Sequence, residues 1–166
     1  MLHTLTATLE DSPGVLDRVA ALFRRRAFNI HSLTVSPGEG HGLSRMTVTV
    51  DADETGVRRV VASLGKLIQV RGVTRHGQRA VMRDLALARV KATESQRPQV
   101  LQIAHIFHAQ IVDLDLESLV LECTGSRDKL DRFIALLEPF GLLELARSGV
   151  VAMAQTPQPS PFDLYA

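Results

Sequence analysis

The spacing of apolar residues changes several times along the first half of the chain. From residue 2 to 9, apolar residues alternate with threonines, which is the two-residue period of a half-buried strand. The motif DSPG follows, and after it apolar residues recur at helical spacing. This pattern predicts a helix over about residues 13–26, with Ser12 as its N-cap and Pro13 in the first helical position.

The pattern then returns to strands. Residues 28–36 and the alternating stretch 45–50 flank a loop rich in proline and glycine, which predicts a hairpin. A second amphipathic stretch, 57–64, predicts a helix, and 67–74 predicts a fourth strand with an irregularity at Gly72. The order is therefore strand, helix, strand, strand, helix, strand.

After a linker-like segment at residues 76–82, the same order starts again. The expected elements are a strand at 83–92, a helix from Pro98, strands at 111–114 and 119–123, a helix behind the N-cap Ser126, and a strand at 142–146. We expect an α+β protein of two tandem ferredoxin-like βαββαβ modules, each a four-stranded antiparallel sheet with two helices on one face. The modules span 1–77 and 78–155, and the proline-rich end, 156–166, is expected to be a flexible tail.

The amino-acid composition limits the classes of binding partner and the cellular compartment that we expect for this protein. Nineteen lysines and arginines against eighteen acids leave a net charge of +1, which disfavours nucleic acid and anionic membranes. The single cysteine, Cys123, excludes a disulfide within the chain and indicates a reducing compartment. No apolar run is long enough to cross a bilayer, so we expect a cytoplasmic protein.

Modules of this size bury a smaller fraction of their unfolded surface than larger domains do. A homodimer is therefore the expected minimum.

Catalytic and metal-binding patterns are weak. His105 and His108 lie three residues apart on an expected helix, but no third ligand stands at a useful spacing, so a metal site is not expected. No nucleophile, phosphate-loop or dinucleotide motif occurs in the sequence. We expect no catalytic residues.

A small-anion site is suggested by the stretch from Glu10 to Leu33. The first helical turn after Pro13 offers unpaired backbone N–H groups, and Gly14 would let a carboxylate approach them closely. Asn29 and Ile30 open the next strand and could lie beside the same helix start in a paired sheet. Alternatively, Gly14 only relieves crowding and Asn29 only turns the chain.

This stretch resembles the ACT domain, a ligand-sensing module. The pattern D-x-P-G-V-L is present at residues 11–16, and an asparagine and an isoleucine follow at Asn29 and Ile30. Segments 28–50, 66–77 and 144–155 are similar to the small subunit of acetohydroxyacid synthase, also called acetolactate synthase.

The resemblance implies that two ACT modules pair edge to edge and that valine, or a related branched-chain amino acid, binds at their interface. In this family pattern, the backbone at Gly14 and Val15 meets the ligand carboxylate, and Asn29 and Ile30 from the partner copy complete the pocket. Asp11 stands where the family has asparagine, and it also belongs to the expected site.

The resemblance also implies a partner. The large catalytic subunit carries thiamine diphosphate, FAD and Mg²⁺, whereas this chain would bind no cofactor and would not be an enzyme by itself. It would activate the large subunit and confer feedback inhibition in branched-chain amino acid biosynthesis.

Three alternatives remain. The first is an ACT-type sensor for a different biosynthetic enzyme, and the second is an RNA-binding domain of the same strand order, although exposed aromatic residues are scarce. The third is a small enzyme of this fold.

Overall fold

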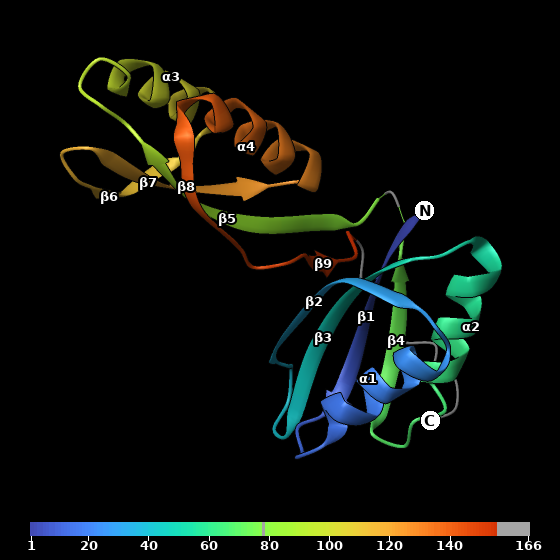
Figure 1. Ribbon diagram of the computed structural model, residues 1–166. Helices are drawn as coiled ribbons and strands as arrows, with labels where there is room; N and C mark the ends of the chain where they lie inside the picture. The colour runs from blue at the N-terminus through green and yellow to red at the C-terminus, as the bar shows by residue number, and fades with distance from the viewer. Residues whose placement is uncertain (78, 156–166) are drawn as a thin grey trace. The chain divides into compact units, whose positions relative to one another are not determined.

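The computed structural model describes residues 1–77 and 79–155 of the chain (Figure 1). The described chain forms two compact units: the first comprises Met1–Val81 and the chain from Val150, and the second Met82–Gly149. Each unit contains a βαββαβ fold with an antiparallel sheet. The expected α+β class and the two ferredoxin-like modules are therefore confirmed.

The first unit is built on a central strand of alternating apolar and threonine residues. Its elements are β1 (Leu2–Glu10), α1 (Val15–Arg25), β2 (Asn29–Pro37), β3 (Leu43–Asp51), α2 (Glu54–Leu64) and β4 (Val70–His76). The strand order is β2-β3-β1-β4, so β2 and β4 are the edges of the sheet. Both helices cover the same face (Figure 1). The expected irregularity near Gly72 occurs as a register shift where β4 pairs with β1.

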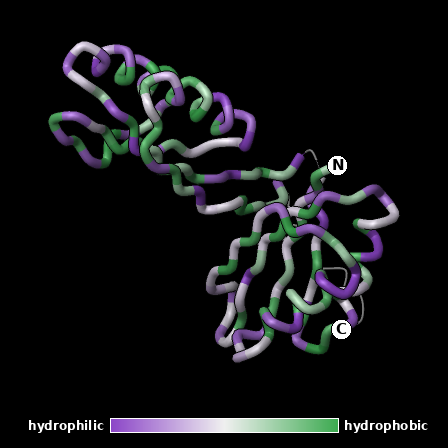
Figure 2. Tube along the Cα trace, viewed as in Figure 1, coloured by the Kyte–Doolittle hydropathy of each residue, from purple (hydrophilic) through white to green (hydrophobic). Residues whose placement is uncertain are grey.

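The core of the first unit lies between this sheet and its helices. The apolar positions of β1 and β3 point toward α1 and α2, as the two-residue alternation requires, and Figure 2 shows this alternation along the strands. Among the fully buried side chains are Leu5, Phe23, Met46 and Leu64. Helix α2 is capped by Asp53, whose carboxylate accepts from the Gly56 N–H at 2.6 Å.

The opposite face of the same sheet is lined by polar side chains that are nevertheless buried. They are Thr4, Thr6, Thr47, Thr49 and His76, each less than 9% exposed. Hydrogen bonds within the face satisfy several of them: the hydroxyls of Thr4 and Thr49 lie 3.2 Å apart, and Thr6 Oγ1 lies 2.9 Å from His76 Nε2. We refer to these five residues as the threonine face.

The chain returns to the first unit after Gly149. The short strand β9 (Val151–Met153) contains Ala152, whose carbonyl oxygen accepts a hydrogen bond from Arg45 Nη2 of β3 at 2.8 Å. The sequence-based second module, 78–155, included residues 150–155, which in the structure group with the first unit. The expected flexible tail, 156–166, lies outside the described residues.

The second unit repeats the fold with a different core. Its elements are β5 (Val81–Lys91), α3 (Arg97–Phe107), β6 (Gln110–Leu114), β7 (Ser118–Gly125), α4 (Arg127–Gly141) and β8 (Leu142–Arg147). This sheet has five strands, one more than expected: four follow the order β6-β7-β5-β8, and β9 is off this path. Helices α3 and α4 lie on one face of it (Figure 1). Phe107 and Phe133 contact each other in the core with ring centroids 5.5 Å apart. The predicted N-cap Ser126 is confirmed, because its hydroxyl accepts from the Lys129 N–H.

Candidate functional site

The segment between β1 and α1 contains a tight turn that moves the start of the helix. Gly14 has φ 83° and ψ −1°, and the Val15 N–H donates to the Ser12 carbonyl at 3.3 Å. These values define a type II turn with proline in its second position and glycine in its third. The predicted helix start at Pro13 with Ser12 as N-cap is therefore wrong. The helix begins at Val15, its N-cap is Gly14, and no side chain caps it.

The turn leaves the first backbone donors of α1 without partners. The first helical hydrogen bond runs from the Arg18 N–H to the Gly14 carbonyl at 3.1 Å. Within the described residues, the N–H groups of Gly14, Leu16 and Asp17 have no backbone acceptor, and no side-chain cap hydrogen bond is present at this helix start. Free N–H groups and the positive end of the helix dipole together favour a bound carboxylate.

A cavity of about 400 Å³ opens in front of these donors. Its lining comes from the end of β1, the turn, the first residues of α1, and the hairpin strands β2 and β3: Leu9, Glu10, Asp11, Ser12, Pro13, Gly14, Val15, Leu16, Val35 and Ser44. A Cβ atom at Gly14 would meet no other atom within 4 Å, so the glycine faces open space. The cavity therefore combines backbone donors, apolar side chains and carboxylates.

Two neighbouring acids in this cavity have different surroundings. Glu10 forms an ion pair with Arg71 of β4, so its charge is compensated. Asp11 is exposed, its backbone N–H donates to the Gly42 carbonyl at 2.8 Å, and its carboxylate has no partner in the described part of the chain. Asp11 is thus available to a cationic group in the cavity.

Three of the five expected site residues come together here, and two do not. Asp11, Gly14 and Val15 line the cavity, and Val15 is itself 5% exposed and belongs to the core. Asn29 and Ile30 lie at the other end of the sheet, since Asn29 pairs with Asp51 and thereby aligns with the start of β1. Six residues of β2 separate Asn29 from Val35, the cavity-lining residue on the same strand, which is about 20 Å. One copy of the chain therefore does not unite all five residues.

The edge strand β2 runs from the end of the sheet that holds Asn29 to the cavity at the start of α1. Two apolar side chains of this strand lie on the helix-covered face, since Leu33 pairs with Val48 and Val35 with Met46. At the sheet edge they stay partly exposed, Leu33 by 43% and Val35 by 37%. Val35 also lines the cavity, together with Ser44 of β3, which is paired with Pro37. Val35 and Ser44 were not among the predicted site residues. The hairpin register, which brings them next to the end of β1, is the signal that would have found them.

The remaining candidates of the sequence occupy other positions. His105 and His108 are exposed, and His108 ends α3 with φ 54°. Among residues 1–77 and 79–155 there is no cluster of three or more side chains suited to a metal ion. Cys123 is fully buried, and burial raises the pKa of its thiol. No helix in the described ranges is long and apolar enough to span a membrane.

Comparison with known proteins assigns the two modules separately. Residues 5–72 match the family model described as the AHAS small subunit-like ACT domain, and residues 83–156 match that of the small subunit of acetolactate synthase. The acetolactate synthase small subunit of Mycobacterium leprae is 45% identical over 157 residues, which cover 94% of this chain and 93% of that protein. The chain belongs to the acetolactate synthase small-subunit family.

Other members of this family agree in length and fold. The probable acetolactate synthase small subunit of Archaeoglobus fulgidus is 45% identical over 155 residues, 93% of this chain and 98% of that protein. The crystal structure of the small subunit from Thermotoga maritima superposes with a TM-score of 0.88 at 34% identity, covering 95% of this chain and 99% of that one. The chain is thus a small, regulatory-type subunit with an N-terminal ACT domain.

Proposed function

We propose that this acetolactate synthase small subunit binds valine, or another branched-chain amino acid, between the ACT domains of two copies and thereby regulates the large catalytic subunit. The observation that carries the proposal is the cavity of about 400 Å³ at the start of α1, where N–H groups without a backbone acceptor in the described chain lie beside the edge strand β2.

Edge pairing of β2 would complete this cavity. Two antiparallel copies of a strand from Asn29 to Pro37, centred on Leu33, would bring Asn29 of one copy opposite Pro37 of the other. Asn29 and Ile30 of the second copy would then lie next to Val35 and the cavity, although within one copy they are about 17 to 20 Å along the strand from Val35. Exposed Leu33 and Val35 would be covered at the same interface.

The chemistry of the lining suits an α-amino acid. The ligand carboxylate would accept from the N–H groups at Gly14 and Leu16, and the ammonium group would face Asp11. Leu16, which is 47% exposed, and Val35 would contact an aliphatic side chain. In this arrangement the Asp11 carboxylate pairs with the charged ammonium group of the ligand. The asparagine usual in the family would offer that group only an uncharged amide dipole.

The partner follows from the family. A small subunit implies a large one, and we propose that the large subunit holds thiamine diphosphate, FAD and Mg²⁺ and performs the reaction. This chain would supply no reacting group. Its effects would be activation and feedback inhibition in the cytoplasm, transmitted through the ACT interface.

Calorimetry tests the proposal directly. The purified full chain is titrated with valine, leucine and isoleucine, and acetolactate formation by the large subunit is measured with and without the chain and each amino acid. We expect the chain to raise activity, and one of the three to bind and to reverse that gain. Normal activation with no response to any of them would refute the ligand assignment, and no effect on the large subunit would refute the partner assignment.

A further inference from the structure

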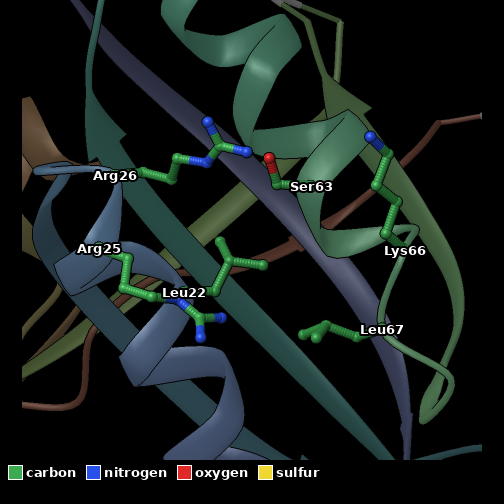
Figure 3. Close-up of a pocket in the computed structure, with 6 residues that line it drawn as sticks. All are labelled: Leu22, Arg25, Arg26, Ser63, Lys66 and Leu67. Atoms are coloured by element: carbon green, nitrogen blue, oxygen red, sulfur yellow. The ribbon is translucent and has the colours of Figure 1, made fainter.

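The first unit has a second hollow, where α1 and α2 end side by side. It lies at the opposite end of α1 from the cavity described above. Its volume is about 390 Å³ and it is lined by Leu22, Arg25, Arg26, Ser63, Lys66 and Leu67. In Figure 3, Leu22, Arg25 and Arg26 come from the end of α1, and the other three come from the end of α2 and the loop behind it. We call this hollow the basic groove.

The groove combines an apolar floor with unpaired cations. Leu22 is 5% exposed and Leu67 is half-buried, while Arg25, Arg26 and Lys66 are exposed. Among the described residues, none of these three cations has an acidic partner within ion-pair distance. Ile68, next to the groove in sequence, is 86% exposed. Such a surface suits carboxylates attached to apolar groups.

The helix ends argue against a compact anion such as phosphate. Phosphate sites use the N-terminal ends of helices, where N–H groups and a positive partial charge converge. The basic groove lies instead at two C-terminal ends, where carbonyl groups carry negative partial charge. Cations on long side chains can meet carboxylates spread along a peptide, away from those carbonyls, and guanidinium groups bind them in bidentate fashion.

We propose that the basic groove is the docking surface for an acidic segment of the large catalytic subunit. An apolar side chain of that segment packs between Leu22 and Leu67, and carboxylates on either side pair with Arg25, Arg26 and Lys66. The proposal rests on the proposed function only for the identity of the partner. It assigns contact with the partner to the helix layer of the ACT unit and leaves the β2 edge for the second copy.

Charge reversal with a matched control tests this surface. Arg25→Glu/Lys66→Glu changes two groove residues, and Arg24→Glu/Arg59→Glu makes the same change in net charge at exposed positions of α1 and α2 outside the groove lining. Arg24 and Arg25 both lie in the last turn of α1, so the effect on the helix dipole is alike. Affinity of each full-length variant for the purified large subunit is measured by sedimentation, and folding is checked by circular dichroism.

We expect Arg25→Glu/Lys66→Glu to bind the large subunit at least about tenfold more weakly, and the control to stay within about twofold of the unchanged chain. The affinity of the neutral variant Arg25→Gln/Lys66→Gln for the large subunit should fall between those two values. This variant replaces the charge reversal if the reversal impairs folding. Binding of amino acid to the isolated chain should not change.

Several results would overturn the assignment. Equal affinities of the groove and control variants, with the unchanged chain binding normally, would refute the groove alone. A shift in oligomeric state of the groove variant would assign the groove to a second copy, and competition by inorganic phosphate at constant ionic strength would assign it to a compact anion. An unchanged chain that does not bind the large subunit would refute the proposed function as well.

Discussion

Arg147 of β8 holds Asp84 of β5 with two of its nitrogens, Nε at 2.9 Å and Nη2 at 2.6 Å from the same carboxylate oxygen, and the Asp84 side chain is only 4% exposed. The third nitrogen, Nη1, donates to Asp131 of α4 at 2.6 Å, and the Ser148 hydroxyl reaches the other oxygen of Asp84 at 3.1 Å. Residues 146–149, which lie within the segment 144–155 that resembles the family, thus join two strands and a helix of the second unit.

Removing this arginine should destabilise the second unit. Arg147→Met leaves the buried Asp84 carboxylate without a counter-charge, and we expect a loss of about 3 kcal/mol in the free energy of unfolding. Arg127→Met is the control, since Arg127 pairs with Asp131 at 3.7 Å on the surface and its loss should cost under about 1 kcal/mol. Urea unfolding followed by circular dichroism measures both. Equal midpoints for the two variants would contradict the prediction.

The threonine face should make the first unit sensitive to acid. Burial, and to a lesser degree the nearby charge of Arg45, hold the pKa of His76 below its ordinary value. The folded protein therefore binds a proton at His76 less readily than the unfolded chain, so stability falls as the pH drops below about 6.5. It continues to fall until the pH reaches the lowered pKa.

Replacing this histidine should reduce that dependence. His76→Gln keeps a group that can bond to Thr6 but cannot be protonated. We expect the variant to lose less stability than the unchanged chain between about pH 7.5 and pH 5.5, as measured by urea titrations at the two pH values. Parallel losses in the two proteins would show that other groups govern the acid response.

At the helix start, a negative charge should oppose ligand binding. Gly14→Asp places a carboxylate next to the unpaired N–H groups, and a like charge at about 4 Å costs roughly 4 kcal/mol at an effective dielectric of 20. Even a third of that weakens binding about tenfold. Because φ at Gly14 is 83°, any side chain there adds strain, so Gly14→Asn, which has the same shape without the charge, is the control.

Calorimetry with valine, leucine and isoleucine measures both Gly14 variants, and the feedback assay should show that Gly14→Asp still activates but resists inhibition. Asp11→Asn should weaken binding modestly, because the ammonium group loses a charged partner. Unchanged inhibition of Gly14→Asp by all three amino acids would place the ligand elsewhere.

Pairing through β2 should be broken by a single lysine. Leu33→Lys puts a charge in the middle of the edge strand β2, a device that natural proteins use to prevent edge pairing. Leu33 is 43% exposed in the single chain, so the fold should survive. Leu143→Lys, on an exposed position of β8 at 58%, is the control. Light scattering at micromolar concentration should show a smaller species only for Leu33→Lys.

The element order was predictable because period-two and helical spacings are local properties of the sequence. Threonines alternating with leucine and alanine in β1, and apolar residues at helical spacing in α1, needed no tertiary information. The helix start was not predictable in the same way. Proline suits both the first position of a helix and the second position of a type II turn, and only the left-handed backbone of Gly14 distinguishes them.

The candidate site was predictable in part. Asp11, Gly14 and Val15 follow one another closely in sequence, so their meeting at one cavity is a local consequence. Val35 reaches that cavity only through the register of the β2–β3 hairpin. The three-residue strand β9 is too short to show any period, so the return of Ala152 to the first unit left no mark in the hydrophobic pattern.

That return has a consequence for how the protein is made. The first unit is discontinuous, so its last described segment, residues 150–155, is synthesised after the whole second unit. At about 5 to 20 residues per second, the ribosome needs roughly 4 to 15 seconds to go from the end of β4 to β9. During that interval the Ala152 carbonyl is not yet present to accept the hydrogen bond from Arg45. A nascent sheet whose second face was apolar would be prone to aggregate with neighbouring chains at this stage. The hydroxyl groups of the threonine face can instead form hydrogen bonds with water until residues 150–155 are synthesised.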